Sequence, residues 1–110
     1  INGFGRIGRM AFRAGLAKKD IEFVGINDLT DTATLAHLLK YDSSAGVLGV
    51  DVSSTENSLI VDGKEIKVFT EKDPANIPWR DTGAEYVLES HSSNSSKSIY
   101  RNFNRHFPPP

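Results

Sequence analysis

The chain has 110 residues, a formal net charge of -1 and a charged fraction of 25%, a composition typical of one globular domain. It contains no cysteine, which excludes disulfides, thiolate metal sites and a cysteine nucleophile within these residues. Its apolar runs are too short for a membrane-spanning helix. The near-neutral charge gives no general attraction to nucleic acid or to anionic membranes. Because the glycine-rich, polar start is unlike a secretory signal, we expect a cytoplasmic location.

The chain opens on a glycine-rich stretch in which Gly3, Gly5 and Gly8 have the spacing G-x-G-x-x-G. At such a turn the first glycine allows a tight bend, the second lets a pyrophosphate approach the backbone, and the third lets the helix pack closely. The following helix would direct its N-terminal N–H groups at the phosphates. Only Ile1 and Asn2 precede Gly3, so we expect a truncated first strand and a fragment of a longer protein.

A helix is predicted from residue 6 to about residue 16, because apolar residues recur there at helical spacing. The predicted apolar face consists of Ile7, Met10, Ala11 and Ala14. A second stripe is basic, and we interpret it as a solvent-exposed face: Arg6, Arg9 and Arg13. Arg6 differs from the other two because it lies inside the glycine turn, where its backbone or side chain could meet an anion.

A buried strand is predicted over Ile21–Asp28, a short and mostly apolar run rich in β-formers. Strand, glycine turn, helix and strand together form a βαβ unit. Asp28 ends the second strand, 20 positions after Gly8. An acid there can accept hydrogen bonds from the adenosine ribose, and its charge would favour NAD over NADP. The alternative is that Asp28 only caps the next turn, and the glycine spacing favours the ribose role.

The remaining elements complete an α/β pattern. Thr30 or Asp31 can cap a second helix that runs to about Lys40. Asp62-Gly63, between two β-rich runs, predicts a β-hairpin, and a further strand is predicted over 84–90. We therefore predict a partial Rossmann-like fold, which is a doubly wound, mostly parallel α/β sheet with a β-hairpin insertion and a truncated first strand.

The last 20 residues differ in character from the rest of the chain. Residues 91–110 are rich in serine and asparagine, end in three prolines, contain no acidic residue and show no helical or alternating period. We expect a disordered tail there, outside a domain that comprises residues 1–90. Its aromatic and basic residues leave nucleic-acid binding as an alternative, which we disfavour because so few charges bind weakly.

Five segments, in unbroken order, resemble glyceraldehyde-3-phosphate dehydrogenase. They are Ile1–Arg9, Ile26–Leu29, Leu35–Ser43, Val61–Lys64 and Glu71–Pro74. The resemblance covers residues 1 to about 90 and is closest to the bacterial-type, glycolytic, NAD-using members. It ends after Ser90, where the family continues with Thr-Gly and this chain has His91-Ser92, so the tail does not resemble the family.

The resemblance implies NAD as cofactor and a set of residues that bind it. These are Gly3, Phe4, Gly5, Arg6, Ile7, Gly8, Asn27, Asp28 and Lys72. Arg6 and Ile7 would contact the pyrophosphate, while the glycines and Phe4 shape the turn. Asp28 would bind the adenosine ribose, and Asn27 would line the adenine side. Lys72 stands where the family has a basic residue whose backbone lies near the adenine, with a solvated lysine as the alternative.

The resemblance also implies a reaction for the full-length protein. The family oxidises glyceraldehyde 3-phosphate through a cysteine thiohemiacetal, transfers hydride to NAD, and releases an acyl phosphate by phosphate attack. The cysteine, the histidine base and the phosphate sites belong to a second domain of a homotetrameric enzyme. We therefore expect no catalytic residue here and an inactive chain. The alternative is a non-catalytic fragment that acts at most as a nucleotide-binding or interaction module.

Overall fold

The computed structural model describes residues 1–42, 46–90 and 98–101. Its elements in chain order are α1 (Arg6–Leu16), β1 (Gly25–Asn27), α2 (Thr32–Lys40), β2 (Tyr41–Asp42), β3 (Gly46–Val47), β4 (Val52–Ser54), β5 (Ser58–Val61), β6 (Lys64–Phe69), η1 (Pro74–Asn76), α3 (Trp79–Thr82), β7 (Tyr86–Glu89) and β8 (Ser98–Arg101). Within these ranges no helix has the length and apolar character needed to cross a membrane. Residues 98–101 of the tail that we expected to be disordered form β8, which pairs with β7, and the remainder of that tail lies outside the described residues.

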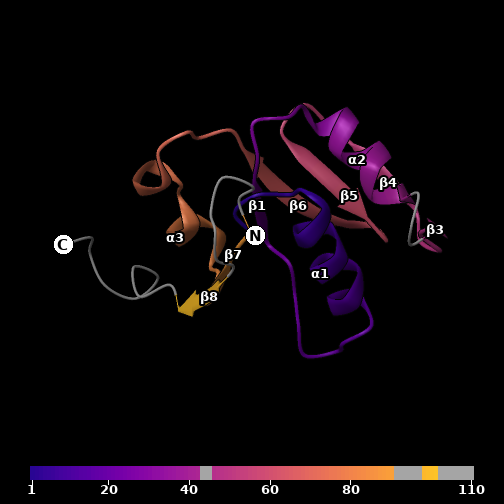
Figure 1. Ribbon diagram of the computed structural model, residues 1–110, viewed down its shortest axis with the longest axis horizontal. Helices are drawn as coiled ribbons and strands as arrows, with labels where there is room; N and C mark the ends of the chain where they lie inside the picture. The colour runs from indigo at the N-terminus through magenta and orange to yellow at the C-terminus, as the bar shows by residue number, and fades with distance from the viewer. Residues whose placement is uncertain (43–45, 91–97, 102–110) are drawn as a thin grey trace.

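The first three residues of the chain lie at the centre of the sheet, between β7 and β1 (Figure 1). Asn2 N donates to Leu88 O at 2.8 Å, and Asn2 O accepts from Ser90 N at 2.8 Å. On the other side Gly3 N donates to Asn27 O at 2.7 Å. Both pairings are parallel, so this short segment joins the strands on its two sides into one sheet. The residues expected to form the first strand therefore lie between β7 and β1.

Outward from this centre the sheet is parallel and then antiparallel. β1 pairs in parallel with β6, and β6, β5 and β4 follow in antiparallel order. β7 carries β8 as an antiparallel neighbour. A parallel centre with a hairpin at one side is the predicted partial Rossmann-like α/β fold. The short β2–β3 hairpin pairs separately from this sheet.

β1 is shorter than the predicted strand over Ile21–Asp28. On one side of β1, Asn27 N donates to Ile1 O at 2.9 Å. On the other side the pairing with β6 starts at Gly25, opposite Lys67. Of residues 21–24, Val24 O accepts from Lys67 N at 3.4 Å, but none of the four is part of a strand.

The predicted hairpin is formed by β5 and β6. Val61 pairs with Lys64, so Asp62 and Gly63 are the two turn residues. Both have positive φ, 53° and 80°, as a type I′ turn requires. This turn has the twist that antiparallel strands need, which explains why an Asp-Gly pair identified the hairpin from sequence.

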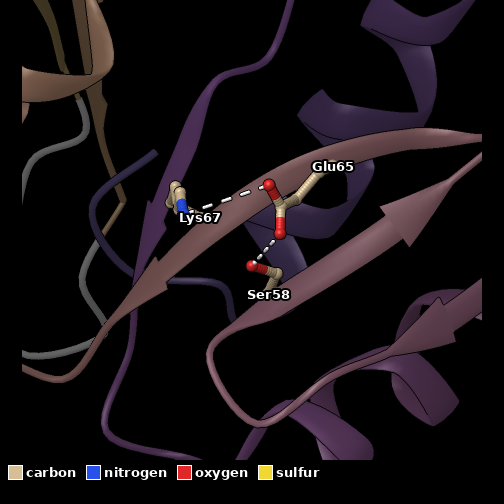
Figure 2. Close-up of polar contacts among 3 residues, drawn as sticks. All are labelled: Ser58, Glu65 and Lys67. Carbon is tan, nitrogen blue, oxygen red and sulfur yellow. Dashed lines mark hydrogen bonds and ion pairs between the residues drawn. The ribbon is translucent and has the colours of Figure 1, made fainter.

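Three polar side chains of the same hairpin, Ser58, Glu65 and Lys67, lie close together (Figure 2). The buried Ser58 hydroxyl donates to Glu65 Oε2 at 2.9 Å, which satisfies it inside the sheet. Lys67 Nζ lies 3.9 Å from Glu65 Oε1, and both of these side chains are more than half exposed. An ion pair this exposed contributes at most about 1 kcal/mol, so this group is scaffold.

The buried face of α1 is not the one predicted. Ile7 and Met10 are 48% and 52% exposed, whereas Gly8, Phe12 and Gly15 are buried against the sheet. The glycines decide the outcome, because a Cβ on Gly15 would lie 2.4 Å from the Phe23 ring. A helix approaches a sheet most closely along a glycine face. The backbone approach thus overrides the apolar pattern of the larger side chains.

Phe12 anchors α1 in the main core. It is fully buried, and the centroid of its ring lies 5.7 Å from that of Phe4 and 4.4 Å from that of Phe23. Strands and α2 complete this core through buried aliphatic residues: Ile26, Leu35, Leu39, Leu59, Val61, Ile66 and Val68. Side chains alternate along β6, so Phe69 points to the opposite face, where its ring centroid lies 6.1 Å from that of Trp79 in α3.

α2 begins as predicted, with Asp31 as its N-cap. Asp31 Oδ1 accepts from Thr34 N at 2.8 Å. Hydrogen bonding from Thr34, its backbone N–H first, lowers the pKa of the Asp31 carboxyl below its usual value. The other end of α2 is held by Arg13 of α1, whose Nη2 donates to Leu39 O at 2.7 Å. A cation suits the C-terminal carbonyls of a helix, so Arg13 is a tether and not the freely solvated residue predicted.

The two faces of α1 give a direct test of the packing. We expect Phe12→Ala to lower the free energy of unfolding by about 3–5 kcal/mol, because it leaves a cavity in the core. Met10→Ala, on the exposed face of the same helix, should change it by less than about 0.5 kcal/mol. Urea unfolding followed by the fluorescence of the single tryptophan, Trp79, measures both variants. A larger loss in Met10→Ala than in Phe12→Ala would contradict the observed orientation of α1.

Candidate functional site

Most of the residues predicted to bind a cofactor meet at one edge of the sheet. The glycine turn follows the central segment, Asp28 follows β1, and Lys72 lies in the loop after β6. Ser90 follows β7 at the same edge. This is the carboxyl edge of the parallel strands, where ligands bind in open α/β sheets.

The glycine turn has the geometry that its sequence predicts. Gly3 has φ of +94°, a backbone conformation that residues with a side chain rarely adopt. Gly8 packs so closely that a Cβ there would lie 2.4 Å from Gly3 O. The buried Ser90 hydroxyl donates to Gly3 O at 2.6 Å, which fixes the turn to the end of β7. The Ser90 hydrogen bond and the close contact at Gly8 therefore both hold the Gly3 carbonyl in place.

The N-terminus of α1 is open for an anion. Gly5 is the N-cap and gives no side-chain cap, and Arg9 N is the first donor within the helix, to Gly5 O at 2.9 Å. A Cβ on Gly5 would meet nothing within 4 Å in the described structure. Arg6 and Ile7 are both exposed at this end. Backbone N–H groups and the positive end of the helix dipole thus face a space that could hold a phosphate.

Asp28 joins the turn to the end of β1. Its Oδ2 accepts from Phe4 N at 2.8 Å, and its Oδ1 accepts from Thr30 N at 2.9 Å. The carboxylate is therefore held by one backbone donor from the glycine turn and one from the following loop. Each carboxylate oxygen has a further lone pair, so both can still accept from a ligand hydroxyl. The turn-capping and ribose-binding interpretations of Asp28 are compatible in this geometry.

Asn27 and Lys72 occupy the side of the site next to β6. Asn27 is buried and exchanges two hydrogen bonds with the backbone of Glu71: its Oδ1 accepts from Glu71 N at 2.9 Å, and its Nδ2 donates to Glu71 O at 3.0 Å. Lys72 follows directly and is exposed. The side chain of Asn27 thus holds the loop that carries Lys72.

Two residues of this edge were not predicted as part of the site. Arg9, which we interpreted as solvent-exposed, turns back so that its Nη1 donates to Phe4 O at 3.0 Å. Its Nε is buried and has no hydrogen-bond partner among the residues that the structure describes. Asn2 is also buried, and its Nδ2 donates to Glu89 Oε2 at 2.6 Å. Neither residue had a sequence signal beyond its position beside a glycine of the turn.

A cavity of about 780 Å³ lies at the opposite, amino edge of the strands. Its lining is mainly apolar and includes Gly15, Phe23, Ala84 and Tyr86. Ile1 also lines it, and the backbone nitrogen of Ile1 donates to Gly25 O at 2.9 Å. None of the predicted cofactor-binding residues lines this cavity, so it is not the candidate site.

Within the described residues, no group of three or more histidine, cysteine, aspartate or glutamate side chains is placed to hold a metal ion. Backbone N–H groups, side-chain amides and the Asp28 carboxylate are among the polar groups of the carboxyl edge. The N–H donors suit phosphate, and the carboxylate can accept from ribose hydroxyl groups.

Comparisons with known proteins agree with this geometry. Residues 1–97 match the family described as glyceraldehyde 3-phosphate dehydrogenase, NAD binding domain. Glyceraldehyde-3-phosphate dehydrogenase 1 of Bacillus cereus is 59% identical over 98 residues, which are 89% of this chain and 29% of that protein. The corresponding enzyme of Thermotoga maritima is 63% identical over 92 residues, 82% of this chain and 28% of that protein. The chain thus spans less than a third of the length of these relatives.

The two glycines of the turn should respond differently to an added methyl group. We expect Gly8→Ala to lower the free energy of unfolding by about 1–2 kcal/mol, because overpacking against the Gly3 carbonyl outweighs the better helix propensity of alanine. Gly5→Ala should cost less than about 1 kcal/mol, since its Cβ meets open space. Thermal unfolding followed by circular dichroism compares them. Equal losses in the two variants would contradict the close helix–turn contact.

Proposed function

Because this chain belongs to the glyceraldehyde-3-phosphate dehydrogenase family, in which it corresponds to the NAD-binding domain, we propose that its carboxyl edge holds the adenosine diphosphate half of NAD. The observation that carries the proposal is the 2.8 Å hydrogen bond from Phe4 N to Asp28 Oδ2. It places the acid suited to ribose directly beside the turn suited to pyrophosphate. The two binding groups therefore form one rigid unit.

In this proposal the pyrophosphate lies over the N-terminus of α1. Gly5 leaves room for it, and the backbone N–H groups of Arg6 and Ile7 face it. The Arg6 side chain, exposed beside the turn, adds a positive charge. Gly3 and Gly8 act indirectly, because they set the turn and the helix approach. Phe4 contributes the backbone N–H that orients Asp28.

Asp28 binds the adenosine ribose through the lone pairs that Phe4 and Thr30 leave unused. Its charge repels the extra 2′-phosphate of NADP, which supports the preference for NAD. Asn27 and Lys72 stand on the adenine side, where Lys72 contributes its backbone and its exposed side chain remains in solvent. These roles comprise the full set of proposed cofactor-binding residues.

For the whole protein we propose the family reaction, in which an aldehyde is oxidised and phosphorylated. In it a cysteine thiolate would add to the aldehyde carbon of glyceraldehyde 3-phosphate, NAD when bound would supply the hydride acceptor for oxidation to a thioester, and phosphate would then displace the thiolate to give the acyl phosphate. This chain supplies no cysteine, so its own contribution is to bind and orient NAD. We expect the purified 110-residue chain to show no dehydrogenase activity.

The organisation of the protein is proposed on the same basis. The predicted domain over residues 1–90 contains all the elements that build the site, and the family match extends past its end to residue 97. The character of the tail residues outside β8 remains a prediction. A cytoplasmic location and a homotetramer of the whole protein follow from the family and remain proposals for this chain.

Removal of the Asp28 carboxylate tests the proposed site. We expect Asp28→Ala to raise the Kd for NAD at least about tenfold, because charge-assisted hydrogen bonds to the ribose are lost. Asp31→Ala is the matched control, since it removes a nearby carboxylate that only caps α2. It should lower stability by about 1 kcal/mol and leave the Kd almost unchanged. Isothermal titration calorimetry with NAD measures both affinities.

Two results would count against the proposal. If the unaltered chain binds no NAD at any reachable concentration, the alternative of a non-catalytic fragment that acts at most as an interaction module is favoured. If Asp28→Ala and Asp31→Ala weaken binding equally, the loss reflects general stability and not a ribose contact. Dehydrogenase turnover by the purified chain would overturn the separate expectation that it is inactive.

A further inference from the structure

Two buried asparagines face each other across the centre of the sheet, at its carboxyl edge. Asn2 and Asn27 are each 3% exposed and are paired residues of neighbouring parallel strands. Their side chains meet directly, because Asn27 Nδ2 donates to Asn2 Oδ1 at 3.0 Å. Buried amides are costly unless they are hydrogen-bonded, so the partners of this pair are informative.

The pair is the middle of a longer polar chain. At one end Asn2 Nδ2 donates to Glu89 Oε2 at 2.6 Å, on the last residue of β7. At the other end Asn27 exchanges hydrogen bonds of 2.9 and 3.0 Å with the backbone of Glu71. One line of hydrogen bonds therefore connects the ends of β7, the central segment and β1 with the loop after β6.

The side chain of Asn27 has both donors engaged inside the protein. Its two amide hydrogens go to Asn2 Oδ1 and to Glu71 O, and its oxygen accepts from Glu71 N. A neutral amide has only two N–H donors. The side chain therefore has no donor left for a ligand, although it lies on the side of the site where the adenine is proposed to bind.

The contact with Glu71 replaces strand pairing where the strands end. The register of β1 and β6 ends at Asn27 and Phe69, and the last backbone bond there runs from Asp28 N to Phe69 O at 2.9 Å. Beyond it, the Asn27 amide presents a donor and an acceptor to Glu71, as a neighbouring strand would. The loop is thus held at a fixed distance from Asp28.

We propose that Asn27 is a positioning residue for base recognition: through its paired hydrogen bonds to Glu71 it holds the backbone of residues 71–72 against the adenine. This inference rests on the proposed NAD site. In it Asn27 donates no hydrogen bond to the cofactor, and Asn2 supports Asn27 by accepting one of its amide hydrogens. Ribose and pyrophosphate are bound by Asp28 and the glycine turn, which this chain of bonds does not include.

Because different residues are proposed to bind the base and the ribose-pyrophosphate part, two ligands that differ only in the base can test the proposal. ADP and UDP share the ribose and the pyrophosphate but differ in the base. We expect the unaltered chain to prefer ADP, and Asn27→Ser to lose affinity for ADP by about fivefold or more while the Kd for UDP changes less than twofold. Ser90→Ala is the matched control, because it removes a different buried hydrogen bond at the same edge. It should affect the two nucleotides equally.

The outcomes separate the two proposals. Equal loss of ADP and UDP affinity in Asn27→Ser would overturn the positioning role, because a structural defect does not distinguish bases. Absence of ADP binding by the unaltered chain would instead refute the proposed NAD site. If Asn27→Ser does not fold, amide hydrogen exchange on the unaltered chain tests whether the Asn27–Glu71 hydrogen bonds hold the loop. The Glu71 amide should be protected without ligand, and its exchange at the rate of an open loop would also overturn the proposal.

Discussion

The candidate site depends on the pairing of the first three residues between β1 and β7. Hydrogen bonds from Asn2 and Gly3 to both neighbours fix the register of this short segment. A slip of one residue would turn the Asn2 side chain to the opposite face and move the glycine turn away from Asp28. Because the helix follows directly, the same pairing also determines where α1 begins and where its N-terminal N–H groups point.

Close backbone approach connects stability with the geometry of the site. Gly8 brings α1 against the Gly3 carbonyl, and Gly15 brings it against Phe23. Phe12, buried between these contacts, anchors the helix in the core. The helix axis, and with it the direction of the helix dipole, is therefore set by packing at three points along one face. Because this face of α1 packs against the rest of the domain, Ile7 and Met10 on its other side are exposed.

The polar groups of the carboxyl edge fall into two sets. Asp28 and the open N-terminus of α1 keep unused hydrogen-bonding capacity that faces outward. The Asn2–Asn27 pair is buried and engaged within the protein. Buried networks of this kind are stable only when their members are satisfied, and they then fix one arrangement of the backbone. In our view the buried Asn2–Asn27 pair fixes the backbone that positions Asp28 and the N-terminus of α1.

The sequence by itself determined the βαβ unit, the glycine turn, the Asp-Gly hairpin, the N-cap of α2 and the family, because each depends on neighbouring residues or on a motif at fixed spacing. Only the tertiary structure decided which face of α1 is buried, that Arg9 and Arg13 are tethered, and that Asn2 joins Asn27. These outcomes depend on backbone separations between segments far apart in the chain. Periodicity places apolar residues on a face, but it carries no information on how closely another segment can approach that face.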